Sequence, residues 1–135
     1  MQAISKKVST HHIFIADEKA MNISFPQLKT VLKNTSSDIS FINISSNGRY
    51  IFQRELDILS RHYPNRLMLY FENFNLAIDE FIENEILQAI INSNICDEMN
   101  FIIMTEDDGF YAIKNHLIFL GIEEKNIHLS FFKID

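Results

Sequence analysis

Short runs of apolar residues alternate along this chain with longer segments in which apolar residues recur at helical spacing. This alternation is typical of βαβ units, which build a parallel sheet. The apolar runs are rich in Ile, Phe, Leu and Met, as expected for strands that are buried on both faces. The pattern predicts five strands, over residues 12–16, 39–44, 67–71, 100–104 and 127–132.

The segments between these strands predict four helices. Ser24 is expected to cap the first helix, with Pro26 in its first turn. Gly121 follows the last helix and is expected to take the left-handed conformation that ends many helices. Because connections between parallel strands are right-handed, the expected fold is an α/β doubly wound sheet with helices on both faces. The predicted helices cover residues 24–33, 51–62, 78–93 and 110–120.

The length of 135 residues predicts one domain over residues 1–135, with its core at about 11–133. An apolar fraction of 47% is typical of a folded chain. The net charge of -6 argues against nonspecific binding to nucleic acid or to an anionic membrane surface. Cys96 is the only cysteine, and no apolar run is long enough to span a bilayer. We therefore expect a cytoplasmic protein without a membrane-spanning segment.

Four segments of the chain carry a further pattern, at residues 51–59 (IFQRELDIL), 63–67 (YPNRL), 117–122 (LIFLGI) and 127–132 (IHLSFF). Their order and spacing resemble the second helix, third strand, last helix and last strand of the NAD(P)H-binding domain in ferredoxin reductase-like flavoenzymes. The resemblance extends over residues 13–132. It implies a five-stranded parallel sheet of order 3-2-1-4-5, with a nucleotide site at the carboxyl ends of strands one and four.

In that family the first strand leads into a glycine-rich turn, whose amides meet a pyrophosphate at the N-terminus of a helix. The resemblance places residues 16–23 (ADEKAMNI) over this turn, and none of its glycines is present. The family's Cys-Gly-Pro motif after the fourth strand corresponds to Met104-Thr105-Glu106. An acidic residue near the end of the family's last strand corresponds to Ser130.

The resemblance assigns candidate nucleotide-binding positions to three loops. In the family, the loop after the second strand reads the adenosine ribose and any 2'-phosphate, so Arg49 is the candidate for that phosphate here. Met104 has no thiol, although its thioether can line a flat apolar pocket. The candidate cofactor-binding residues are Asp17, Glu18, Ala20, Asn22, Ser45, Ser46, Arg49, Met104, Thr105 and Glu106.

Carboxylates dominate the two loops at the predicted site. A carboxylate about 4 Å from a phosphate charge costs about 1 kcal/mol in water and about 4 kcal/mol at the effective dielectric of a protein surface. We therefore predict that NAD(P)H binding is weak or lost. An alternative ligand is Mg²⁺ or Ca²⁺, which take carboxylate oxygens, although the spaced loop of an EF-hand is absent. The charged residues of these loops are Asp17, Glu18, Lys19, Glu106, Asp107 and Asp108.

Two functions follow from the resemblance. The first is an electron-transfer module that delivers hydride from NAD(P)H to FAD or FMN held by a separate domain or a redox partner protein. Because the residues before Thr10 are too few for a flavin-binding barrel, we expect no catalysis by this chain alone. The second is a non-catalytic interaction domain with an acidic rim in place of the phosphate site.

Other catalytic patterns are not apparent. The sequence contains no P-loop, nucleophile elbow or spaced pair of nucleophile and base. His11 and His12 are adjacent on a predicted strand, where neighbouring side chains point to opposite faces. We therefore expect no metal ion shared by these two histidines.

Overall fold

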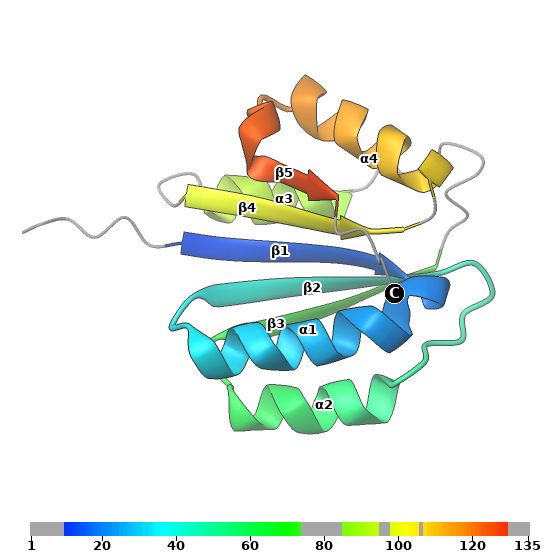
Figure 1. Cartoon of the computed structure of the whole chain (residues 1–135), viewed down its shortest axis with the longest axis vertical. Coiled ribbons are helices and arrows are strands. Elements are labelled where there is room, and N and C mark those ends of the chain that lie inside the picture. Colours follow the sequence, from blue (N-terminus) through cyan, green and yellow to red (C-terminus); the bar gives the residue numbers. More distant parts are fainter. Residues whose placement is uncertain (1–9, 74–84, 95–97, 106, 130–135) are drawn as a thin grey trace, which may run out of the picture.

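The computed structural model describes residues 10–73, 85–94, 98–105 and 107–129. Within these residues, five parallel strands form one sheet in the order β3-β2-β1-β4-β5, shown in Figure 1. This order confirms the predicted doubly wound sheet. The strands are β1 (Thr10–Asp17), β2 (Asp38–Ser45), β3 (Leu67–Asn73), β4 (Glu98–Met104) and β5 (Ile127–Leu129).

All five predicted strands are present. β2, β3 and β4 are each two residues longer than predicted, and β1 is three residues longer. The predicted end of the last strand, at residues 130–132, lies outside the described residues. The described helices are the 3-10 turn η1 (Glu18–Ala20), α1 (Met21–Asn34), α2 (Gln53–His62), α3 (Glu85–Ser93), α4 (Asp107–Phe119) and the 3-10 turn η4 (Glu124–Asn126).

The predicted start of the first helix is wrong. Helix α1 begins at Met21, and Ser24 lies inside it, fully buried, with its hydroxyl donating to the Ala20 carbonyl at 2.7 Å. Asp17 caps the preceding turn η1 instead, because its carboxylate accepts the Ala20 backbone N–H. Pro26 consequently lies in the second turn of α1 rather than in the first.

Two other helix starts differ from the sequence pattern. Helix α2 begins at Gln53 rather than Ile51, after Phe52 in a left-handed conformation with φ of 66°. Helix α4 begins at Asp107 rather than Phe110. Acidic residues are favoured in the first turn of a helix, where the positive end of its dipole lies, and the sequence has Asp107 and Asp108 at this position. The predicted start of the third helix, at residue 78, lies outside the described residues.

Gly121 ends α4 as predicted. Its φ of 98° lies in the left-handed region that glycine adopts without steric cost. The Ile122 N–H donates to the Leu117 carbonyl and the Gly121 N–H donates to the Ile118 carbonyl, both at 3.0 Å. This pair of hydrogen bonds is the Schellman motif, and it satisfies two carbonyls that the helix end would otherwise leave without donors.

Two apolar layers enclose the sheet. Successive residues of β1 alternate between them: Ile13 and Ile15 pack in the layer that includes α3 and α4, whereas Phe14 and Ala16 pack in the layer that includes α1 and α2. Figure 1 shows the two pairs of helices on opposite sides of the sheet. β1 is therefore buried on both faces, as a central parallel strand is.

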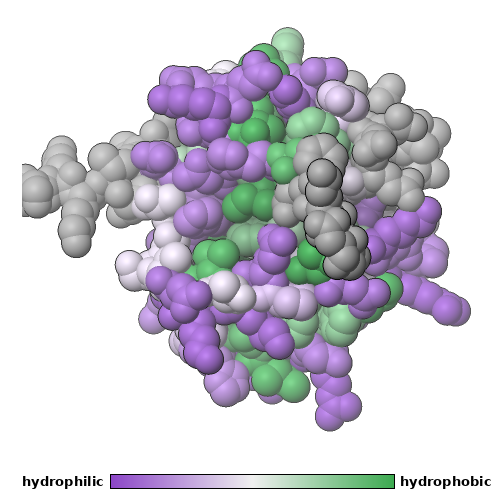
Figure 2. All heavy atoms as spheres, viewed as in Figure 1, coloured by the Kyte–Doolittle hydropathy of each residue, from purple (hydrophilic) through white to green (hydrophobic). Residues whose placement is uncertain are grey.

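The outer surface is mixed in character. Figure 2 shows hydrophilic side chains over most of the visible surface, with hydrophobic side chains in separate patches between them. Among the residues that the structure describes, no helix has the length and apolarity needed to cross a membrane.

Arg66, which directly precedes β3, forms hydrogen bonds to the connection between α1 and β2. Its guanidinium donates to the carbonyls of Leu32 at 3.0 Å, Thr35 at 2.8 Å and Ser37 at 3.0 Å. Its Cζ also lies 5.4 Å from the centroid of the Tyr63 ring. A planar guanidinium can serve three carbonyls in fixed directions, which the single ammonium group of lysine cannot reproduce.

Replacing this guanidinium should destabilise the fold. We expect Arg66→Lys to lower the free energy of unfolding by about 1–3 kcal/mol, because charge-assisted hydrogen bonds to carbonyl groups are lost. Urea denaturation of both proteins measures this difference. Arg61→Lys, at an exposed position on α2, is the matched control and should change little. Equal stability of the two variants would contradict a structural role for Arg66.

Candidate functional site

The carboxyl ends of β1 and β4 lie side by side, because Ala16 pairs with Met104 across the two parallel strands. From this edge the chain continues from β1 into α1 on one face of the sheet, and from β4 into α4 on the other. Ligands of open α/β sheets bind where the connections of two neighbouring strands diverge in this way. The candidate site is therefore this switch point.

Asp17 ends β1 and caps the turn that follows. Its backbone is extended, with φ of -88° and ψ of 175°, and its Oδ1 accepts a hydrogen bond of 3.0 Å from the Ala20 backbone N–H. Aspartate is a preferred capping residue because its carboxylate satisfies an amide that the helix leaves without a partner. Amides in this location hold the pyrophosphate in dinucleotide sites. Here the Ala20 amide donates instead to a carboxylate of the protein, that of Asp17.

Glu18 reaches from η1 to the loop after β2. Its Oε1 accepts a hydrogen bond of 3.2 Å from the Ser46 hydroxyl. In the same loop, Asn47 Oδ1 accepts from the Ser45 hydroxyl at 2.8 Å and from the Arg49 backbone N–H at 2.9 Å. The structure thus joins Glu18 to the loop that carries the candidate ribose-binding residues. The Arg49 side chain is exposed.

Met104 and Ala20 belong to the core. Met104 is fully buried and Ala20 is nearly so, and both pack in the apolar layer of Phe14, Ala16 and Met21. A fully buried side chain presents no surface to a ligand, so the Met104 thioether fills space between the sheet and α1. Sequence spacing shows that Met104 ends a strand, but it does not show that its side chain is fully buried in the layer of α1 and α2.

The remaining candidates are spread around the same edge. Thr105 follows β4 and is buried, whereas Asn22 is exposed in the first turn of α1. Asp107 and Asp108 form the start of α4. Glu106 and Ser130 lie outside the described residues. The alternative cation site therefore falls only partly within the described chain.

The loop between β1 and α1 has a net negative charge. Asp17 and Glu18 carry carboxylates there, and Lys19 carries the only ammonium group. Both carboxylates accept hydrogen bonds, so their oxygens are held in place at the switch point. A phosphate at this edge would meet like charge, which raises its free energy of binding.

Asn43 is a buried polar residue that the sequence reasoning missed. It lies on β2 between Ala16 of β1 and Phe71 of β3, and it is 1% exposed. Neither its Oδ1 nor its Nδ2 has a hydrogen-bond partner among the described residues. A buried polar group without a partner costs about 1–3 kcal/mol. The available signal was one amide side chain within the otherwise apolar segment at residues 41–44 (FINI).

The histidines do not form a metal site in the described part of the chain. His11 Nε2 and Ser40 Oγ form a buried hydrogen bond of 2.8 Å. Burial lowers the pKa of His12, and the neighbouring His11 and His128 lower it further. The His128 Nε2 lies 3.4 Å from Asn100 Oδ1. Among the described residues, no three His, Cys, Asp or Glu side chains lie where they could hold one metal ion.

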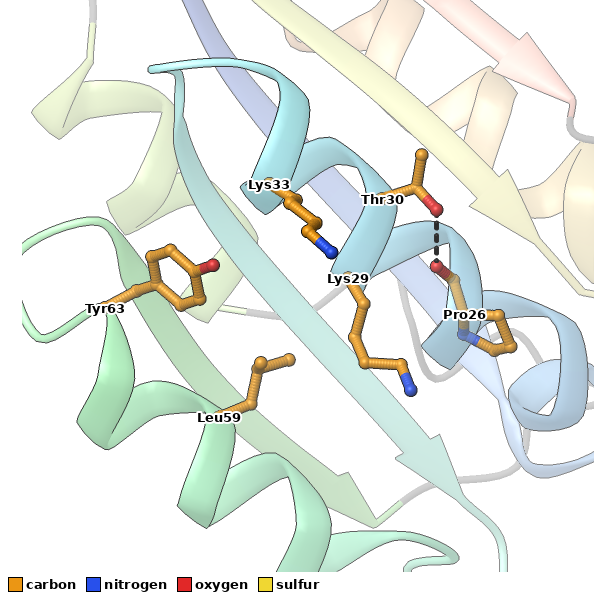
Figure 3. Close-up of a pocket in the computed structure, with 6 residues that line it drawn as sticks. All are labelled: Pro26, Lys29, Thr30, Lys33, Leu59 and Tyr63. Carbon is orange, nitrogen blue, oxygen red and sulfur yellow. Dashed lines mark hydrogen bonds between the residues drawn. The ribbon is translucent and has the colours of Figure 1, made fainter.

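A groove of about 510 Å³ lies away from the switch point, between α1 and α2 (Figure 3). Figure 3 shows Lys29 and Lys33 on α1 and Leu59 on α2. Tyr63, which directly follows α2, is the other aromatic or apolar residue drawn on that side. The Lys29 Nζ also lies 4.9 Å from the centroid of the Phe25 ring. None of the residues that line this groove is a candidate nucleotide residue, so it is a separate surface feature. They are Pro26, Lys29, Thr30, Lys33, Leu59 and Tyr63.

The fold is similar to that of several solved structures. No protein-family model matches the sequence, and no curated protein matches it either. Among solved structures, ferredoxin-NADP+ reductase from Plasmodium falciparum is similar over 91% of this chain and 52% of that chain, with a TM-score of 0.68 and 20% identity. The CS-b5R domains of human Ncb5or, in the NAD+ form, match 91% of this chain and 37% of that chain, with a TM-score of 0.65 and 13% identity.

A third similar structure is the flavohem-like FAD/NAD-binding domain of nitric oxide dioxygenase from Vibrio cholerae. It matches 96% of this chain and 53% of that chain, with a TM-score of 0.63 and 14% identity. Together these similarities show that the chain has the ferredoxin reductase-like NAD-binding fold, as the sequence resemblance predicted. The chain spans about half the length of the Plasmodium reductase.

The buried Asn43 amide without partners is expected to lower the stability of the fold. We expect Asn43→Val to raise the free energy of unfolding by about 1–3 kcal/mol, because a buried amide without partners is replaced by an apolar side chain of similar size. Thermal and urea unfolding measure the change. Ser45→Ala, which removes a satisfied hydroxyl on the same strand, should lower stability. A destabilised Asn43→Val protein would show that the amide has a stabilising contact.

Proposed function

We propose that this chain is an NAD(P)H-binding-type module of the ferredoxin reductase-like oxidoreductase lineage whose affinity for the nucleotide is weak or lost. Its fold and the position of the switch point support the lineage. Hydride transfer would need FAD or FMN from a separate domain or partner, so the chain alone is proposed to be inactive.

The observation that carries this proposal is the hydrogen bond from the Ala20 N–H to the Asp17 carboxylate. In a dinucleotide site, amides at the start of the first helix donate to the pyrophosphate, and glycines let the phosphates approach. A phosphate at this position would have to displace the carboxylate of Asp17 or bind beside it. Either choice weakens nucleotide binding.

Glu18 adds to this effect. Its carboxylate is fixed by Ser46 close to the same turn. A single carboxylate about 4 Å from a phosphate charge costs about 1 kcal/mol in water and about 4 kcal/mol at a protein surface. Since about 1.4 kcal/mol corresponds to a tenfold change in affinity, two such carboxylates account for a loss of roughly thirtyfold or more.

The adenosine end of the site is less altered. Ser45 and Ser46 donate their hydroxyls to Asn47 and Glu18, respectively, so these groups are engaged within the protein. The exposed Arg49 side chain stands beside them on the same loop. A guanidinium can donate two parallel hydrogen bonds to one phosphate. Arg49 would therefore bind the 2'-phosphate of NADPH and favour NADPH over NADH in any residual binding.

A second candidate function is a non-catalytic interaction domain. The exposed apolar side chains of α4 favour it: Tyr111 is 60% exposed, Ile118 is 43% exposed and Phe119 is 85% exposed. Tyr111 and Ile118 are seven residues apart and thus share one face of the helix. A flavin domain or another protein that covers this face would fit either function.

Removing the two carboxylates should improve nucleotide binding. We expect the double variant Asp17→Asn, Glu18→Gln to bind NADPH at least tenfold more tightly than the unmodified chain, because the asparagine can still cap η1 while the charge is gone. Calorimetric titration at low ionic strength, where phosphate contacts are least screened, measures the dissociation constants.

The matched control is the double variant Glu55→Gln, Asp57→Asn. It removes the same charge from exposed positions of α2, and NADPH affinity should stay at the unmodified level. Micromolar binding by the unmodified chain would contradict the proposal of a weakened site. Equal gains in the two double variants would show that net charge, rather than the position of Asp17 and Glu18, limits binding.

A further inference from the structure

A second cavity lies toward the opposite edge of the sheet from the candidate nucleotide site. It has a volume of about 310 Å³ and lies between α3 and the amino-terminal halves of β1, β2 and β3. His11, Ser40 and Met68 line it from the three strands, and Ile86 and Ile90 line it from α3. Its volume is at the lower end of the range for small-molecule pockets in proteins.

The cavity arises from small side chains within an otherwise filled layer. Along β2, Ile42 and Ile44 pack in the layer of α3 and α4, whereas Ser40 takes the equivalent inward position nearer the start of the strand. Opposite it, α3 presents Ala89 and Ser93. Protein interiors are normally packed as closely as organic crystals, so small side chains on both sides leave space between the sheet and α3.

The deep end of the cavity is polar. His11 Nε2 and Ser40 Oγ form a hydrogen bond of 2.8 Å, and the two residues are 6% and 2% exposed. A serine hydroxyl has one donor and two acceptor positions. Its bond to His11 uses one of these positions, so the Ser40 hydroxyl can bond one polar group of a ligand.

Apolar side chains line most of the remaining surface, with the polar residues Ser93 and Asn94 at the carboxyl-terminal end of α3. Ile86 and Ile90 form the α3 wall, while Tyr70 is half-buried on β3 and Met68 is 52% exposed at the opening. Methionine sulfur makes favourable contacts with aromatic rings. Among the described residues that line the cavity there is no Lys, Arg, Asp or Glu side chain, so a charged ligand would lose its hydration there without a counter-charge from these residues.

We propose that this cavity binds a small neutral aromatic alcohol, with the ring between Met68 and Ile90 and the hydroxyl bonded to Ser40. A ring matches the apolar side chains of Met68, Ile86 and Ile90, and a hydroxyl matches the buried Ser40 hydroxyl. This site shares no residue with the switch point, so it is independent of the function proposed for that edge.

The test uses 4-methylphenol as the probe and the full chain as the protein. NMR titration should give saturable shifts of the Ser40, Ala89 and Ile90 amides, with a dissociation constant on the order of 1 mM for a ligand of this size. Toluene, which lacks the hydroxyl, should bind the unmodified chain at least threefold more weakly. Ser40→Ala should remove that preference.

Two variants on neighbouring positions of α3 separate the cavity from general surface binding. Ala89→Leu places a larger side chain at the exposed rim and should weaken 4-methylphenol at least tenfold. Gln88→Leu adds the same apolar group at an exposed position that does not line the cavity, and should leave the affinity unchanged. Both variants change exposed positions of α3, and their amide spectra report whether the fold is retained.

The proposal is overturned if 4-methylphenol causes no saturable shift in the folded, unmodified chain. It is also overturned if the shifts saturate at residues away from the cavity, or if Gln88→Leu weakens binding as much as Ala89→Leu does. Loss of nucleotide binding leaves this result unaffected, because the two sites share no residue.

Discussion

Burial of β1 on both faces is the constraint on which the rest of the structure depends. Ile13 and Ile15 anchor one apolar layer, while Phe14 and Ala16 anchor the other. Pairing with β2 on one side and β4 on the other leaves β1 no freedom to slip, because a shift of one residue would exchange its two faces. The end of β1 is therefore fixed at the switch point, and Asp17 is placed there with it.

That placement connects the fold to its proposed function. The same turn that would approach a pyrophosphate in a dinucleotide site is closed here by a side chain of the protein, with Ala20 buried beneath it. A capping hydrogen bond of this kind stabilises the start of a helix by about 1 kcal/mol, which makes the loss of the glycine-rich turn favourable for folding. In the proposed function, stability at this loop and nucleotide affinity are therefore opposed.

The strand pattern and the strand order could be predicted because buried parallel strands are short, apolar and separated by helical segments. Gly121 was predictable for a local reason, since a left-handed helix end favours glycine. The start of α1 was not, because Asp17 and Ser24 are both capping residues and only the tertiary packing of Ser24 decides between them. The pair of His11 and Ser40 joins residues 29 positions apart, a contact that no local spacing indicates.

The proposed function depends on the hydrogen bond from the Ala20 amide to the Asp17 carboxylate. NMR measures this directly if the Ala20 amide resonance and the Asp17 carboxyl carbon are followed together as the pH is lowered. We expect the Ala20 resonance to move with the same midpoint as the Asp17 carboxyl, and Asp17→Asn to abolish this movement. An Ala20 amide that is insensitive to protonation of Asp17 would contradict a hydrogen bond between the two groups.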